Sequence, residues 1–158
     1  MRATALLLSV LALSSFPQGC FSDGPIGMFP GGRLRGEASA CPALGSGGWD
    51  RFADEIESEL ELRPSAPRSV RTWNLVHQGD LIVPADFLTP IKRWPHQVLE
   101  EPEVRIRIAG EIFECRATRI VDADRIEAIR EKLAAKYGIE PDSRAARIEV
   151  WWFQLDPR

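Results

Sequence analysis

The sequence predicts a mainly β domain with some α-helix: a small antiparallel β-barrel of about six or seven strands, with one long and one short helix. Three observations predict it. Apolar and polar residues alternate with period two in several short segments. Glycine-centred turns at Gly79 and Gly110 join such segments into hairpins. Residues 122–138 instead place apolar residues at helical spacing, which predicts a helix of about four turns.

The sequence predicts the first elements of the chain less clearly. Residues 31–40 could form an edge strand around Leu34, and residues 49–53 a single helical turn. Residues 56–62 alternate clearly, with leucines on one face and three acids, Glu57, Glu59 and Glu61, on the other. We expect these acids to face water. No His or Cys lies at ligand spacing from them, so no metal site is expected.

Residues 70–77 and 81–83 form a predicted hairpin around Gly79. Arg71 and Trp73 lie on one face of its first strand, together with Leu75 and His77. A mixed aromatic and basic face is typical of a ligand groove, and a barrel strand that ends at its rim would look the same.

The most informative short segment is TPIKRWPHQVLEEP, residues 89–102. A short helix is expected to start near Pro95 and to end before Pro102. Lys92, Arg93 and Trp94 then precede the helix, where free amides and two cations favour an anion such as phosphate. His96, in the first turn, could reach the same phosphate. The alternative is that the two cations simply solvate an exposed loop.

The remaining elements complete the barrel. Residues 103–121 read as a second hairpin around Ala109-Gly110, and Asp122 can cap the long helix that Gly138 closes. The final segment, residues 147–158, predicts a strand that is apolar on both faces. Such a strand is central in a barrel or lies in an interface.

The N-terminus predicts export. Residues 1–19 contain Arg2, an apolar run at 5–13 and small residues, which is typical of a secretory signal. Cys20 follows Gly19, where a bacterial lipoprotein carries its lipidated cysteine, although Pro17 and Gln18 depart from the usual lipobox. The expected organisation is a signal peptide (1–19), a lipid-anchored tether and lead-in (20–48) and the barrel domain (49–158). A plain secreted protein is the alternative.

Charge and cysteine content add two expectations. Without residues 1–19, which contain one base and no acid, 19 bases face 23 acids, a net charge of −4. This balance disfavours nucleic acid as a partner. In an oxidising compartment Cys41 and Cys115 could form a disulfide, or Cys115 could remain a buried thiol.

From Gly79 onward the order of GDLIVPA, a basic loop with a tryptophan, a short helix, EPEV, a glycine hairpin and a closing WWFQLDPR resembles the flavin-binding split β-barrels. These include the pyridoxamine-phosphate-oxidase-like and the deazaflavin-dependent nitroreductase-like proteins. The resemblance covers about residues 70–158. The lead-in, Gly24-Pro25 followed by PGGRLRG at 30–36, is also similar to a group of uncharacterised bacterial lipoproteins.

The resemblance implies a homodimer that binds FMN or a deazaflavin at its subunit interface and acts as an oxidoreductase. The family's basic loop corresponds to Lys92, Arg93 and Trp94, and we add Arg71, Trp73 and His96 from their position and facing. Pro95 and His96 depart from the family's pattern. The alternative is a non-catalytic lipoprotein module that binds an unknown ligand. In either case we expect a bacterial protein anchored to a membrane on the periplasmic or outer side through Cys20.

Overall fold

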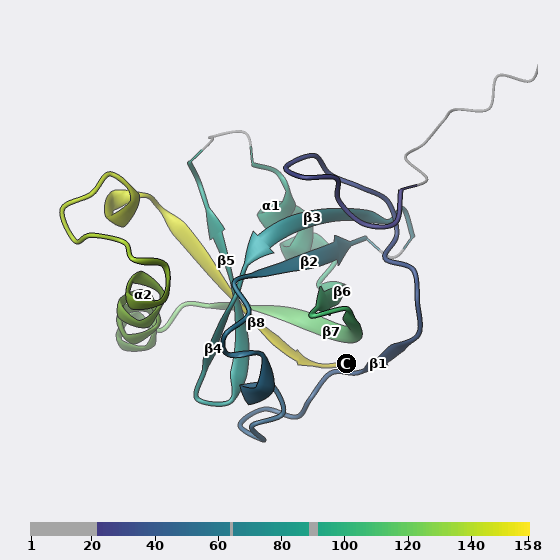
Figure 1. The fold of residues 1–158 in the computed structure, drawn as a ribbon, viewed down its shortest axis with the longest axis horizontal. Coiled ribbons are helices and arrows are strands. Elements are labelled where there is room, and N and C mark those ends of the chain that lie inside the picture. Colours follow the sequence, from purple (N-terminus) through teal and green to yellow (C-terminus); the bar gives the residue numbers. More distant parts are fainter. Residues whose placement is uncertain (1–21, 64, 89–91) are drawn as a thin grey trace, which may run out of the picture.

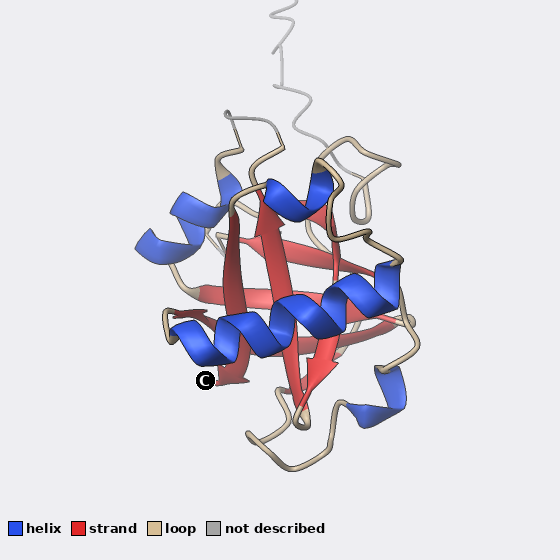
Figure 2. Ribbon diagram, turned by 90° about the vertical axis from the view of Figure 1, so that its left-hand side faces the viewer, coloured by secondary structure: helices blue, strands red, loops and turns tan. Residues whose placement is uncertain are grey.

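The computed structural model describes residues 22–63, 65–88 and 92–158; the predicted signal peptide (1–19) and Cys20 lie outside them. The described residues form eight strands in a single sheet, two α-helices and two short 3-10 helices (Figures 1 and 2). The strands are β1 (Ala38–Ala40), β2 (Glu57–Leu62), β3 (Arg68–Trp73), β4 (Leu75–His77), β5 (Asp80–Asp86), β6 (Glu103–Ile108), β7 (Glu111–Ile120) and β8 (Val150–Pro157).

The sheet runs in the order β3-β2-β6-β7-β8-β5-β4, and β1 pairs in parallel with the first half of β7. All other pairs are antiparallel. The sheet curls so that β3 contacts β5, where the Thr72 hydroxyl donates a hydrogen bond to the Pro84 carbonyl at 3.2 Å. A side-chain hydrogen bond thus joins β3 to β5, where a closed barrel would have backbone hydrogen bonds between the two strands. The predicted antiparallel, split β-barrel is confirmed.

Two tight turns set the register of the hairpins. Gln78 and Gly79 between β4 and β5, and Ala109 and Gly110 between β6 and β7, all have positive φ. This is the geometry of the two-residue turns whose twist matches that of the flanking strands. Both predicted hairpins are confirmed. The predicted strand 70–77 is instead divided at Asn74 into β3 and β4, because its two halves pair with different partners, β2 and β5.

The two helices pack on different sides of the sheet. Helix α1 (Trp94–Glu100) starts one residue before the predicted Pro95 and buries Trp94 and Val98 in the barrel interior. Helix α2 (Ala123–Tyr137) packs across the outside of β4, β5 and β8 (Figure 2). As predicted, the Asp122 side chain caps it by accepting a hydrogen bond from Arg125 N at 2.8 Å, and Gly138 closes it with φ of 63°.

The core has two parts that meet at β8. Phe153 and Leu155 belong to the barrel interior, whereas Trp152 packs with α2 on the other side of the same strand. Strand β8 lies between β7 and β5. The expectation of a central strand that is apolar on both faces is confirmed.

Residues 22–48 lie along the edge and outer face of the sheet. Leu34 is fully buried, and a pair of backbone hydrogen bonds joins Gly31 to Ser69 at the start of β3. A disulfide links Cys41, just after β1, to Cys115 in β7, with a Cα–Cα distance of 5.1 Å. The short 3-10 helix η1 (Asp50–Phe52) follows, and its Phe52 joins the core as part of an aromatic group with Trp49 and Phe113.

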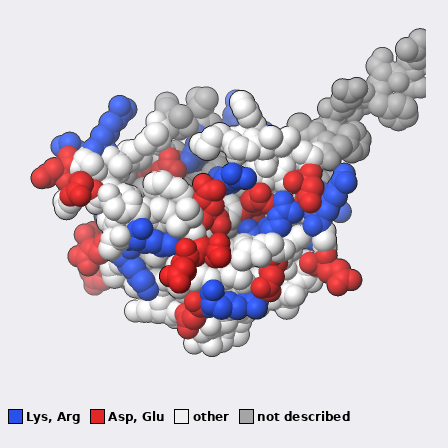
Figure 3. Space-filling view, in the orientation of Figure 1, with Lys and Arg blue, Asp and Glu red and all other residues white. Residues whose placement is uncertain are grey.

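The expectation that all three glutamates of β2 face water is wrong for Glu61. Its side chain is 1% exposed, because the lead-in around Leu34 covers it. Arginines on the neighbouring strand β6 meet these acids: Glu61 lies opposite Arg105, and Glu59 opposite Arg107. The outer face of β2 and β6 is therefore a ladder of ion pairs, and acidic and basic side chains intermingle over it in Figure 3.

Candidate functional site

Half-buried and exposed rings meet where β5 ends, β8 begins and α1 starts. The ring of Trp151 contacts Phe87 and His96, with centroids 5.0 and 4.8 Å away. On β7, Arg119 places its guanidinium carbon 3.9 Å from the centroid of the same Trp151 ring. His96 and Arg119 are exposed, whereas Phe87 and Trp151 are half-buried. We call these four residues, Phe87, His96, Arg119 and Trp151, the rim cluster.

The strands position the rim cluster. Trp151 follows the alternation of β8 and so points to the same side as Phe153, towards the barrel interior. Arg119 follows Ala117 on the interior side of β7 and reaches the rim. The Trp151 indole N–H donates to the Glu149 carboxylate at 2.9 Å, and Phe87 N donates to the Glu149 carbonyl at 2.9 Å. These bonds fix the orientation of the Trp151 ring and leave part of it accessible.

Of the four residues predicted to bind a cofactor around the start of α1, Lys92, Arg93, Trp94 and His96, only His96 belongs to the rim cluster. Trp94 is 8% exposed and packs on Phe153, so its indole is part of the core. Lys92 Nζ lies 2.7 Å from the Asp86 carboxylate, and this ion pair ties the loop to the end of β5. Arg93 is exposed just before α1. With seven residues, α1 is too short to supply a strong N-terminal dipole.

Arg71 and Trp73 lie elsewhere, on the outer face of β3. Arg71 lies 3.6 Å from Glu57 and 3.7 Å from Glu59. Trp73 stacks on Tyr137 of α2, with centroids 4.5 Å apart and an interplanar angle of 12°. The structure therefore separates the six residues predicted to bind a cofactor into three places: the α1 loop, the outer face of β2 and β3, and the end of α2.

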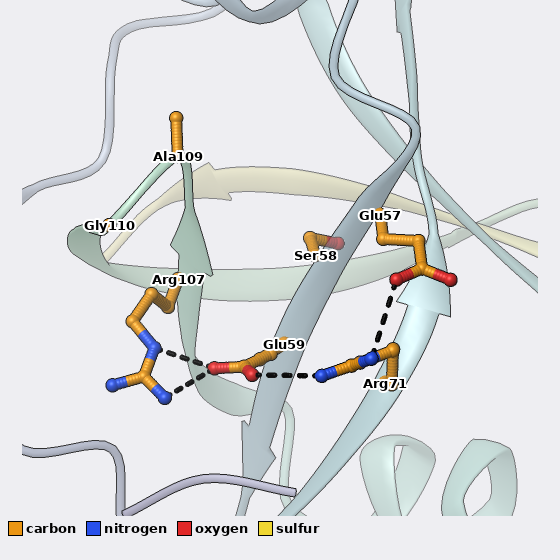
Figure 4. A pocket seen from close by; sticks show the side chains of 7 residues that line it. All are labelled: Glu57, Ser58, Glu59, Arg71, Arg107, Ala109 and Gly110. Carbon is orange, nitrogen blue, oxygen red and sulfur yellow. Dashed lines mark hydrogen bonds and ion pairs between the residues drawn. The ribbon is translucent and has the colours of Figure 1, made fainter. Parts of the chain in front are cut away.

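Arg71 lines a shallow pocket of about 260 Å³ together with Glu57, Glu59 and Arg107 (Figure 4). Arg107 Nε donates to Glu59 at 2.5 Å, and its Nη1 lies 2.9 Å from Asp23. Burial alone would lower the pKa of Arg107, but the hydrogen bonds to Glu59 and Asp23 outweigh it and raise that pKa. Asp23 has a lowered pKa, chiefly because it accepts a hydrogen bond from Arg35 N. The charges lining this pocket are already neutralised by one another.

Three residues of the rim cluster, Phe87, Arg119 and Trp151, were not predicted as site residues. In the sequence, Phe87 is only the end of a predicted strand, and Arg119 is one of several arginines in alternating positions. Trp151 is an apolar residue in a predicted strand, so none of the three stands out as a site residue. Their proximity depends on the ladders that β8 forms with both β5 and β7. Pairings this distant in sequence cannot be read from local patterns.

No protein-family model matches the sequence, and no curated protein matches it. Solved structures do share its fold. A candidate pyridoxamine 5′-phosphate oxidase from Listeria innocua aligns with a TM-score of 0.53 at 15% identity, over 73% of this chain and 94% of its own. An FAD-binding protein from Mesorhizobium loti aligns with a TM-score of 0.50 at 12% identity, over 76% and 92% of the two chains. The predicted resemblance to the flavin-binding split β-barrels is confirmed at the level of the fold.

The rim cluster fits a flavin-type group in its chemistry. Flat rings recognise an aromatic ring system by stacking or edge contact, and guanidinium groups bind phosphate through paired hydrogen bonds. Arg93 and Arg119 take part in no ion pair within the described part of the chain. The shallow pocket at Arg71 does not fit, because it is lined by paired ions and is smaller than the roughly 300–1,000 Å³ of ordinary ligand sites.

Proposed function

We propose that this protein binds a flavin-type cofactor at the rim cluster and acts as an oxidoreductase. The observation that supports the site is Arg119 over one side of the Trp151 ring, with Phe87 and His96 against the same ring. The shared fold with an FAD-binding protein supports the class of cofactor. FMN and a deazaflavin both remain candidates, since both present a flat ring system and a phosphate.

When bound, such a cofactor supplies hydride or electron transfer, so the chain itself needs only to bind and orient it. Phe87 and Trp151 would contact the ring system. Arg119, Arg93 and His96 would bind the phosphate. The Lys92–Asp86 ion pair would hold the loop before α1 in place beside them.

We also propose that a second copy of the chain completes the site. Leu88 and Leu99 are 61% and 47% exposed, and they flank the rim cluster from the end of β5 and from α1. Leu99 lies three residues after His96, on the same face of the helix. A partner subunit over this apolar border would exclude water from the cofactor ring.

Titration of the purified protein with riboflavin phosphate and with a deazaflavin, followed by ring fluorescence, tests the proposal. Saturable binding of either one by a dimeric sample supports it. A folded sample that binds neither would overturn it and leave the second candidate, a binding or structural module without turnover. Two observations favour that second candidate. Trp94 is buried in the core and Lys92 is paired with Asp86, so neither side chain is free to contact a cofactor.

The proposed location is the bacterial cell envelope, with anchoring through a lipid on Cys20. The Cys41–Cys115 disulfide supports an oxidising compartment, because such bonds persist mainly in exported proteins. Among the described residues, no helix is both long and apolar enough to cross a membrane. Mass spectrometry of the protein from a bacterial host tests the location: loss of residues 1–19 with a diacylglycerol adduct on Cys20 is expected, and an intact N-terminus would contradict it.

A further inference from the structure

We propose that the turn formed by residues 26–29, here called the apolar tip, inserts into the surface of a bilayer that carries anionic phospholipids. The tip presents three large apolar side chains to solvent: Ile26 is 68% exposed, Phe29 76% and Met28 92%. Three such side chains within four residues are unusual on a protein surface and typical of a contact site. This proposal is independent of the cofactor site, because it rests on no residue of the rim cluster.

The tip is a built structure. Ile26 N donates to the Phe29 carbonyl at 3.1 Å, and Phe29 N returns a bond to the Ile26 carbonyl at 3.0 Å, which closes the turn. At its base, a Cβ atom on Gly31 would lie only 1.7 Å from the Gly24 carbonyl oxygen, so the two arms of the turn approach as closely as glycine permits. The turn is therefore already ordered, and its insertion into a bilayer should cost little conformational entropy.

The sheet anchors the base of the tip. Gly31 and Ser69 exchange two backbone hydrogen bonds of 2.9 and 3.0 Å, and the Ser69 hydroxyl donates to the Gly32 carbonyl at 2.7 Å. Asp23, on the other arm, lies 2.9 Å from Arg107 of β6. Residues 26–29 thus belong to a loop whose base is attached to the sheet, drawn in purple next to β3 in Figure 1.

The charge beside the tip favours an anionic lipid surface. Arg63 and Arg68 are exposed at the two ends of the β2–β3 turn, and Arg68 directly precedes Ser69, which binds the base of the tip. Basic side chains next to an inserting apolar group are attracted to the negative potential of phosphatidylglycerol-type headgroups. The chain as a whole has a net charge of −3, so the attraction to anionic lipid depends on these local arginines.

The position of the tip in the chain, close to Cys20, favours a membrane as its binding partner. It begins only six residues after Cys20 and thirteen after the apolar run of residues 5–13. Six residues span at most about 20 Å when fully extended. Attachment through a lipid on Cys20 would therefore hold the start of the tip within about 20 Å of the bilayer surface. A membrane is therefore a better occupant for the tip than a soluble partner.

The test places an environment-sensitive dye on the full chain. A Cys20→Ser background leaves only the introduced cysteine reactive, because Cys41 and Cys115 form a disulfide. The dye is attached through Met28→Cys in the tip or, as a control, through Leu44→Cys, which is 50% exposed in the loop beside Asp80 at the other end of the molecule. Each protein is reconstituted into phosphatidylcholine vesicles with and without phosphatidylglycerol, and doxyl-labelled lipids serve as quenchers.

We expect the dye at position 28 to shift its emission to the blue and to be quenched by doxyl lipids, and the dye at position 44 to do neither. Adding Ile26→Ser and Phe29→Ser should abolish the response, and Arg63→Ser with Arg68→Ser should remove the preference for phosphatidylglycerol. Equal responses at positions 28 and 44, or no response at 28, would overturn the proposal. So would a blue emission at 28 without vesicles that rises with protein concentration, because a second copy would then cover the tip.

Discussion

The Glu61 carboxylate lies 3.3 Å from Nη1 of Arg105 on the neighbouring strand, beneath the lead-in residues 34–36. Glu61 also accepts a hydrogen bond from Leu34 N at 2.6 Å, and Arg105 donates to the Leu34 carbonyl at 2.7 Å. The two side chains therefore satisfy both backbone groups of Leu34 while they neutralise each other. This pair attaches the lead-in to the barrel.

Replacing Glu61 by alanine should destabilise the protein by about 3 kcal/mol, because it removes the carboxylate that neutralises the partly buried Arg105 guanidinium and leaves Leu34 N without an acceptor. Urea unfolding measures this free energy. Glu57→Ala on the same strand is the matched control: its side chain is 50% exposed, and we expect a loss of about 0.5 kcal/mol or less. Equal effects of the two substitutions would show that the buried pair has no special role.

The Cys41–Cys115 disulfide closes a loop with a sequence separation of 74 residues. Because cross-linking so long a loop restricts the unfolded chain, Cys41→Ala should lower the free energy of unfolding by about 2–4 kcal/mol. A reductant should destabilise the wild-type protein by a similar amount and leave the variant unchanged. If reductant had no effect on a wild-type sample whose thiols are shown to be free, the bond would not contribute to stability.

His77 links stability to pH. It is 8% exposed, and burial lowers its pKa, with Lys132 and Arg125 acting in the same direction and outweighing the opposite effect of Asp80. As pH falls below the unfolded value of about 6.5, the unfolded chain takes up a proton that folded His77 resists. Stability should therefore fall as pH is lowered from about 7 to about 5.

Urea midpoints across this pH range measure the dependence, and His77→Gln supplies the comparison. The variant should lose the part of the slope that His77 contributes, whereas His96→Gln, at an exposed position, is the control for the other histidine. A slope that survives unchanged in His77→Gln would contradict the assignment.

Local patterns predicted most of the barrel. The hairpins at Gly79 and Gly110, the capped helix α2 and the two-faced strand β8 depend on turn residues and periodicity, which act over a few positions. The environment of Glu61 could not be predicted in this way. Whether an alternating acid faces water depends on what covers the sheet, and Leu34 lies 27 residues away in sequence.

The candidate site was predicted only in part, for a related reason. Lys92 and Arg93 precede α1 as predicted, yet Trp94 starts the helix and enters the core, and Lys92 is paired with Asp86. Which side of the short helix faces inward decides this, and seven residues carry too little periodicity to show it. Arg119 and Trp151 meet through the β7–β8 ladder, in which Arg119 lies opposite Phe153.

The affinity for riboflavin phosphate of wild type, Arg119→Ala and Arg116→Ala tests the central claim most directly. Arg116 is an exposed arginine on the same strand, but its position in the alternation turns it away from Trp151. Losing a charge-assisted phosphate contact should weaken binding about tenfold in Arg119→Ala and leave Arg116→Ala close to wild type. Equal affinities for all three proteins, or no binding by a folded wild-type dimer, would contradict a flavin site at the rim cluster.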